Sequence, residues 1–383
     1  MLFSQMTLGQ LELPNRLVMA PLTRLRSGKE GIPGPLVVEH YRQRASLGLI
    51  VSEGTYPSPA GRGFPGQPGL VTEEQLKGWA DVTAAVHAEG GRIFAQVMHA
   101  GRVTHEDTTG GHEVVAPSAI AIDGVTRTYE GKKAFPIPHA LTADELPGIR
   151  EEFVRASRNA VEAGFDGVEL HSANGYLLHE FLTPAANQRD DIYGGSPENR
   201  ARFVIEVVQA VVDAIGADRV GIRISPEHNV QGALELDAAD VRDTYGYLVD
   251  ALAPLKLAYL SVLHKEPTSE LVQELRKRES ESAAVVFDAH PSVESVVAAM
   301  RKGSEMVGHS RVFRQLLSLA HQVAKADAPV LIAGAPGTGK RRLARAIHAS
   351  SPRAAGPFVE FNVEMFAPEV VEDVLRESLV AAR

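Results

Sequence analysis

Short apolar runs alternate with longer amphipathic segments through the first two thirds of the chain. This alternation predicts successive βα units around a parallel sheet, and six such units can be placed. The predicted strands are residues 17–20, 49–52, 93–97, 167–170, 220–224 and 258–263. The predicted helices are residues 36–46, 73–88, 143–163, 197–215, 238–253 and 269–276.

Helix boundary signals support this division. Ser196-Pro197-Glu198 combines a hydroxyl N-cap, a proline at the first helical position and an acid near the positive end of the helix dipole. Gly164 and Gly216 are typical of helix C-terminal ends. Residues 101–138, rich in Gly, Thr and His, form too long a stretch to be a bare connection, so we expect them to cover the mouth of a site.

Polar side chains follow the fourth predicted strand. His171, Asn174 and Tyr176 place two hydrogen-bond donors and a phenol directly after an apolar run. Enzymes built on barrels carry their chemistry on loops at this end of the strands. The trio therefore indicates a site that activates a carbonyl group and has its own proton source, and the alternative is an ordinary loop with capped polar groups.

Composition narrows the class of protein. The 383 residues are 44% hydrophobic and 23% charged, and no apolar run is long enough to cross a membrane. Without cysteine there is no disulfide, no thiolate nucleophile and no cysteine-bound metal, so redox chemistry needs a cofactor. A net charge of −9 argues against DNA as a partner. The start of the chain lacks the features of a signal peptide, which predicts a cytoplasmic protein.

Six ordered motifs carry a family resemblance. They are NRLVMAPLTR (15–24), SEGT (52–55), AQVMHAGR (95–102), HSANGY (171–176), TPAANQRDDIYGGSPENR (183–200) and GIRIS (221–225). Together they resemble the Old Yellow Enzyme family of flavin-dependent ene-reductases, from residue 1 to about 278. The resemblance implies a (β/α)₈ TIM-type barrel that binds FMN, is reduced by NAD(P)H, and reduces α,β-unsaturated carbonyl or nitro compounds.

The resemblance also implies where the flavin binds. Pro21, Leu22 and Thr23 would line it, with the Thr23 hydroxyl near its reactive edge. Gly54 would let the backbone approach the ring, although a plain turn glycine looks the same in sequence.

Two polar residues inside apolar strands belong to the same implied site. Gln96 would meet the pyrimidine edge of the flavin, and a buried structural amide is its alternative. Arg223 would face the N1 side of the reduced flavin, and a buried Asp or Glu is the alternative partner.

For the substrate, the resemblance implies that His171 and Asn174 donate hydrogen bonds to the carbonyl oxygen and that Tyr176 protonates the α-carbon. No dinucleotide fingerprint follows a strand, which fits a nicotinamide that shares the substrate pocket. His99, His105 and His112 are spaced too irregularly to indicate a metal site, so none is predicted. The oligomeric state is not predicted.

The last hundred residues differ in character. Residues 283–303 resemble the late strand and helix of a response-regulator receiver domain, and residues 307–375 resemble the opening of the AAA+ domain of sigma-54-dependent transcriptional activators. We therefore expect an ene-reductase barrel at 1–279, a receiver-like segment at 280–303 and an incomplete AAA+ fragment at 304–383.

A phosphate-binding loop marks the AAA+ fragment. Gly334, Gly337, Gly339 and Lys340 would hold the phosphates of ATP. Arg341 replaces the usual Ser or Thr, and the later motifs of that family are missing, so hydrolysis is not expected. The alternative function is an ATP-binding regulatory module fused to an inactive barrel.

The barrel itself raises a question, because the resemblance ends after six βα units whereas a (β/α)₈ barrel has eight strands. The family's last two units are therefore missing or substituted. Residues 284–287 and 330–333 are candidates for substitute strands. A hydrogen-bonded pairing of either segment with the sheet would test this hypothesis.

Overall fold

The computed structural model describes residues 4–266, 268–279, 284–288, 344 and 347–348. The chain divides into two units, Met1–His290 and Pro291–Arg383. Every helix and strand named below belongs to the first unit.

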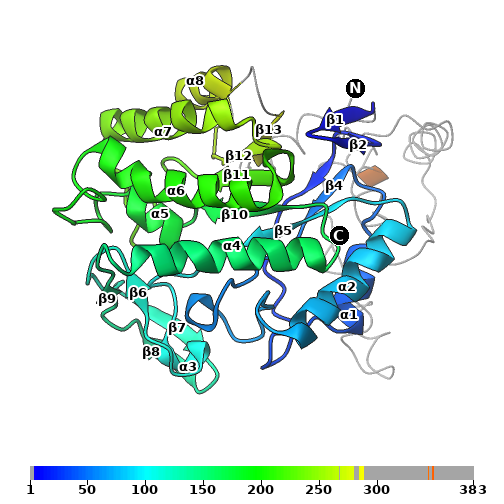
Figure 1. Ribbon diagram of the computed structural model, residues 1–383, viewed down its shortest axis with the longest axis horizontal. Coiled ribbons are helices and arrows are strands. Elements are labelled where there is room, and N and C mark those ends of the chain that lie inside the picture. The colour runs from blue at the N-terminus through cyan, green and yellow to red at the C-terminus, as the bar shows by residue number, and fades with distance from the viewer. Residues whose placement is uncertain (1–3, 267, 280–283, 289–343, 345–346, 349–383) are drawn as a thin grey trace, which may run out of the picture. The chain divides into compact units, whose positions relative to one another are not determined.

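A parallel sheet lies at the centre of this unit (Figure 1). Its order in the described residues is β13-β12-β11-β10-β5-β4-β3, so neighbours in the sheet follow the order of the chain. This is the winding of a TIM-type barrel. The strands are β3 (Val18–Met19), β4 (Leu49–Val51), β5 (Ile93–Val97), β10 (Gly167–Ser172), β11 (Val220–Ile224), β12 (Tyr259–Leu263) and β13 (Ala284–Asp288).

Helices cover the outer face of the sheet, and each packs against the next along the series (Figure 1). They are α1 (Pro35–Arg42), α2 (Glu73–Ala88), α4 (Leu146–Glu162), α6 (Pro197–Ile215), α7 (Ala238–Leu252) and α8 (Glu270–Glu279). Their apolar faces and the outward residues of the strands form the main core. All six predicted strands and all six predicted helices are confirmed, with small shifts at their ends.

The predicted helix ends are confirmed as well. The Ser196 hydroxyl accepts a hydrogen bond from the Asn199 N–H at the start of α6, and Pro197 occupies the first turn. Gly216 ends the same helix, and both Gly164 (φ +87°) and Gly216 (φ +91°) have backbone conformations that favour glycine.

An antiparallel hairpin made of β1 (Met6–Leu8) and β2 (Leu11–Leu13) packs against apolar side chains of the central sheet. Leu8 and Leu13 of the hairpin pack with Leu49, Phe94 and Tyr259 of the sheet, all of them buried. The hairpin was not predicted, because its two strands are only three residues long.

The long connection after β5 contains its own structure, as expected. It holds α3 (Glu106–Thr109), the pair β6 (Val115–Ala116) and β9 (His139–Ala140), and the hairpin of β7 (Val125–Thr128) and β8 (Gly131–Ala134). A further short helix, α5 (Leu177–Leu182), follows β10 and was also not predicted. One-turn segments at Pro59–Gly61, Ala217–Arg219 and Ala253–Leu255 are 3₁₀ helices.

The seventh strand settles one of the sequence hypotheses. β13 pairs in parallel with β12, from Tyr259 opposite Ala284 to Leu263 opposite Asp288. The segment after the sixth unit therefore supplies a strand to the sheet, as proposed for residues 284–287. The second candidate, residues 330–333, lies outside the described residues. The domain limits at 279 and 303 remain predictions.

Candidate active site

A cavity of about 400 Å³ opens where the carboxyl ends of the strands meet. Its volume is in the range typical of small-molecule sites. The residues that line it are Ala20, Pro21, Leu22, Thr23, Gln96, Met98, His171, Asn174, Tyr176 and Arg223. Every residue predicted for the barrel site except Gly54 is therefore brought to one cavity.

The parallel register explains this convergence. Gln96, His171 and Arg223 are each the last residue but one of their strands, β5, β10 and β11. His171 is the register partner of Arg223, and Gln96 is the partner of Glu169. Because the strands run in the same direction, residues widely separated in the chain reach the same end of the barrel.

Gly54 lies beneath the cavity rather than in its lining. A Cβ at this position would lie 2.7 Å from the Met98 Sδ and 3.3 Å from the Gln96 Oε1. A side chain at residue 54 would displace one or both of these lining residues. Glycine at this position therefore leaves Met98 and Gln96 in the places where they line the cavity.

His171 is a buried, neutral donor. Burial lowers its pKa well below the usual value, and the charges of Arg223 and His179 lower it further. Its Nδ1 is buried and has no hydrogen-bond partner among the described residues. A neutral imidazole at the cavity wall offers one N–H, whose position depends on the tautomer.

Tyr176 lies beside His171. The centres of the two rings are 5.0 Å apart in an edge-on arrangement. The centre of the Phe64 ring lies 6.4 Å from that of Tyr176, also edge-on. Burial raises the pKa of the Tyr176 phenol, and a hydrogen bond with Gln231 partly opposes this. The phenol therefore keeps its proton at neutral pH and can act as an acid.

Asn174 is held in a left-handed backbone conformation, with φ +58°. Asparagine adopts this conformation more readily than most residues. Its backbone N–H donates to the Ser225 hydroxyl at 2.9 Å, and its carbonyl accepts from the Gln231 side chain at 2.9 Å. The turn that carries the donor is thus fixed by the segment that follows β11.

Sequence reasoning missed the residues of that segment. Ser225, His228 and Gln231 all contact Asn174, but a single sequence shows only a polar stretch after a strand. Nothing in their spacing distinguishes them from an ordinary loop.

Gln96 and Arg223 have protein partners as well as the cavity. The Gln96 Nε2 donates to the Glu169 Oε1 at 2.8 Å, as expected for a buried amide, and its Oε1 is not bonded to Glu169. The Arg223 Nη1 donates to the Ser261 hydroxyl at 3.1 Å. Both side chains are more than nine-tenths buried, yet both line the cavity.

A buried acid, Glu180, lies one helical turn beyond Tyr176. Glu180 is completely buried in α5, and its Oε1 accepts a hydrogen bond from the Arg102 N–H at 2.9 Å. Its Oε2 has no partner among the described residues. Burial raises the pKa of Glu180 to about 8, against an opposing effect of Arg102.

We expect Glu180→Gln to stabilise the protein above neutral pH. A raised pKa means that the folded state holds the proton that the unfolded state loses above pH 4.5, so wild-type stability falls as pH rises from about 4.5 to 8. The uncharged amide removes this loss, which is on the order of 5 kcal/mol. Denaturant unfolding at pH 5, 6.5 and 8 would measure it. Glu89→Gln removes the same charge from an exposed side chain and is the control, and a constant difference between Glu180→Gln and wild type would contradict the prediction.

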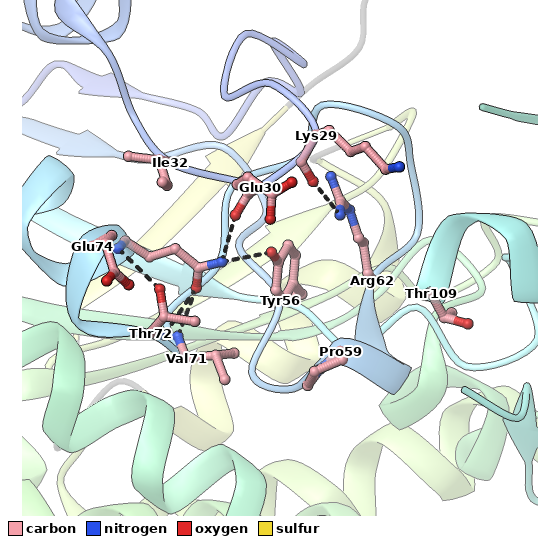
Figure 2. A pocket seen from close by; sticks show the side chains of 11 residues that line it. Lys29, Glu30, Ile32, Tyr56, Pro59, Arg62, Val71, Thr72, Glu74 and Thr109 are labelled. Atoms are coloured by element: carbon pink, nitrogen blue, oxygen red, sulfur yellow. Dashed lines mark hydrogen bonds between the residues drawn. The ribbon is translucent and has the colours of Figure 1, made fainter. Parts of the chain in front are cut away.

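A second cavity, of about 410 Å³, lies between the loop of residues 29–32, the segment 56–62 and the start of α2 (Figure 2). Arg62 is buried there, donates to the Lys29 carbonyl at 2.7 Å, and lies 5.4 Å from the centre of the Tyr56 ring. Gln75 bonds to the Glu30 carbonyl and to the Tyr56 hydroxyl. These contacts join two loops to a helix, and no predicted site residue lines this cavity.

The predicted phosphate-binding loop lies outside the described residues, since all four of its predicted residues do: Gly334, Gly337, Gly339 and Lys340. In the part of the chain that the structure describes, no group of three or more His, Asp or Glu residues is placed to hold a metal ion. Within the same part, no helix is both long and apolar enough to span a membrane.

Comparison with known proteins decides the family. The sequence profile of the NADH:flavin oxidoreductase / NADH oxidase family matches residues 1–322. The chain belongs to this family. The match extends beyond residue 278, where the resemblance of the motifs ends, and includes β13.

Similar proteins support the assignment to the NADH:flavin oxidoreductase family. The flavin oxidoreductase hxnT of Emericella nidulans is 41% identical over 317 residues, which cover 79% of either chain. The 12-oxophytodienoate reductase 7 of Oryza sativa subsp. japonica is 42% identical and covers 70% of either chain.

Solved structures of similar proteins support the same family and show its fold. The old yellow enzyme homologue from Zymomonas mobilis has a TM-score of 0.72 at 35% identity, covering 83% of this chain and 93% of the other. Morphinone reductase in complex with tetrahydroNAD has a TM-score of 0.70 at 40% identity, covering 79% and 84%. The fold is therefore a TIM-type barrel of the old yellow enzyme kind.

Membership of the NADH:flavin oxidoreductase family makes this chain an NAD(P)H-dependent flavin oxidoreductase. FMN fits the hydrogen-bonding groups of the cavity. The Gln96 amide and the Arg223 guanidinium line the cavity together with the His171 imidazole, whose Nδ1 has no partner in the described residues. Polar edges of a flavin ring complement such groups.

A second profile matches the C-terminal region. The Sigma-54 interaction domain matches residues 306–376, which include the glycine-rich segment around Lys340. This agrees with the resemblance seen in the sequence of this region. Nucleotide binding there remains a prediction.

Proposed function

We propose that this protein reduces activated alkenes, with α,β-unsaturated carbonyl compounds as the main substrate class and nitroalkenes as a second. The observation that carries this proposal is the convergence of predicted flavin-side residues and of His171, Asn174 and Tyr176 on one cavity of about 400 Å³. FMN, when bound, supplies the hydride. Pro21, Leu22, Thr23, Gln96 and Arg223 would hold it, and Gly54 would keep the wall beneath it closely packed.

His171 and Asn174 polarise the substrate. Their N–H groups donate to the carbonyl oxygen, which draws electron density from the β-carbon and makes it a hydride acceptor. His171 lies in β10 and Asn174 in the turn that follows it, so their mutual position is fixed before the substrate arrives. Donors held in place at a developing oxyanion are among the largest contributions to catalysis.

Tyr176 supplies the proton to the α-carbon. Its phenol retains the proton at neutral pH because burial raises its pKa. When the proton leaves, the hydrogen bond from Gln231 stabilises the phenolate. Tyr176 packs in an apolar cluster with Phe64, Met98 and Val103, of which Met98 also lines the cavity, and these contacts limit the access of water to the phenol.

The decisive experiment is a redox titration of the purified chain. We expect visible flavin absorbance that bleaches when NADPH or NADH is added without oxygen and returns when 2-cyclohexenone is added, with cyclohexanone as the product. A preparation that contains FMN but is not reoxidised by the enone would overturn the proposed substrate class. A colourless preparation that does not take up added FMN would overturn the cofactor assignment.

We infer a second, separate capacity for the C-terminal region, the binding of ATP at Gly334, Gly337, Gly339 and Lys340. The match of the Sigma-54 interaction domain to residues 306–376 supports it, and backbone N–H groups with a lysine are suited to phosphates. Binding of a fluorescent ATP analogue that Lys340→Ala abolishes would support this function, and equal binding by both proteins would exclude it.

A further inference from the structure

The segment after β11 packs against the turn of residues 172–176, which carries Asn174 and Tyr176 and which we call the catalytic turn. Residues 226–236 pass over the turn of residues 172–176, and a Cβ on Gly175 would lie 2.9 Å from the Gln231 Cβ and 3.0 Å from the Val230 carbonyl oxygen. This close approach, with φ +79° at Gly175, leaves no room for a side chain there. We call residues 226–236 the clamp loop.

A buried carboxylate anchors the clamp loop. Glu235 accepts hydrogen bonds from the Tyr245 hydroxyl and the Glu227 N–H, both at 2.7 Å. The His179 Nε2 lies 3.2 Å from the Glu235 Oε1. Because the His179 Nδ1 accepts from the Gly175 N–H at 2.8 Å, the proton of this ring is on Nε2 and points at Glu235. The loop, helix α5 and the catalytic turn thus form one bonded unit.

Within this unit, His228 contacts the side chain of Asn174. The His228 Nδ1 lies 3.1 Å from the Asn174 Oδ1. A carboxamide has one accepting and one donating end, and either end can face a ligand. With its oxygen toward His228, Asn174 presents its Nδ2 donor to the cavity that it lines.

We propose that His228 is a positioning residue that holds the Asn174 carboxamide with its N–H₂ toward the substrate. The site is thereby set to receive an acceptor oxygen, such as that of a carbonyl or nitro group. This inference rests on the proposed function, because it gives Asn174 the role of a donor to the substrate. His228 does not touch the substrate in this scheme and acts only through Asn174.

A double-mutant cycle tests the proposal. His228→Phe keeps a ring of similar size and removes the N–H, and we expect kcat/KM for 2-cyclohexenone to fall about tenfold, as for the loss of one oriented hydrogen bond. In an Asn174→Ala background the same change should have no further effect, since the residue it positions is absent. His228→Gln, which retains a side-chain N–H, should recover most of the activity. His87→Phe, at an exposed histidine of α2, controls for the loss of a histidine.

Each result has a defined meaning. Flavin absorbance and Tm of every variant should match wild type, which separates positioning from loss of structure. The proposal is overturned if His228→Phe lowers kcat/KM equally in both backgrounds, or if His228→Phe is silent while Asn174→Ala lowers the rate. If Asn174→Ala itself leaves the enone reaction unchanged, the proposed donor role of Asn174 is wrong. The positioning role of His228 is then wrong as well, because it acts through that donor.

Discussion

Replacement of Tyr176 by Phe is expected to slow alkene reduction by at least about 100-fold, the lower range for removal of a general acid. The aromatic ring, and with it the contacts to His171 and Phe64, is retained. Only the O–H that we propose as the source of the α-carbon proton is lost. Reduction of the flavin by NAD(P)H involves no such proton, so its rate should stay within about twofold of wild type.

Stopped-flow absorbance measures the two half-reactions of this variant separately. Tyr193→Phe removes a phenol hydroxyl that contacts Glu206 and does not line the cavity, which makes it a matched control. Equal losses in both half-reactions would show that Tyr176 shapes the pocket and does not deliver the proton. The retained flavin spectrum serves as the check that the site is intact.

The barrel could be predicted because its strands and helices are long and strongly patterned. Buried runs such as residues 93–97 and 220–224 and the capped start of α6 each carry a local signal. Once the strands are parallel, their polar ends must meet at one end of the barrel. The cavity that unites Gln96, His171 and Arg223 follows from this geometry.

The remaining parts depend on contacts that have no local signal. The β1–β2 hairpin forms because Leu8 and Leu13 find a buried partner in Phe94, far away in the sequence. The clamp loop is irregular and is fixed by individual hydrogen bonds, one between Glu235 and His179 and two that join His228 and Gln231 to Asn174. Such bonds depend on tertiary structure and leave no periodic pattern in the sequence.

The clamp loop also relates the fold to the chemistry. His171 is set by its place in β10, whereas Asn174 and Tyr176 lie beyond the strand and need other support. Ser225, His228 and Gln231 supply it from the next βα connection. The proposed donor pair and the proposed acid are thus held by two adjacent strands, which keeps their geometry more rigid than a single loop could.

Replacement of His171 by Phe is expected to lower kcat/KM for 2-cyclohexenone by 10²- to 10³-fold, roughly the effect of removing one donor from an oxyanion site. A phenyl ring fits the buried space beside Tyr176 and removes the N–H. Because the pKa of His171 lies well below its usual value, the imidazole is neutral above pH 6 and its titration should leave no step in the wild-type rate between pH 6 and 8.

Steady-state kinetics at saturating NADPH across this pH range measure both effects. His171→Gln keeps a donor at the position and should be faster than His171→Phe, whereas an equal loss would point to packing as the role of this ring. A wild-type rate that falls as pH rises through 6.5 would mean that a charged imidazole is the active form. That outcome would contradict the neutral donor and would require an anion to compensate Arg223, its register partner in β11.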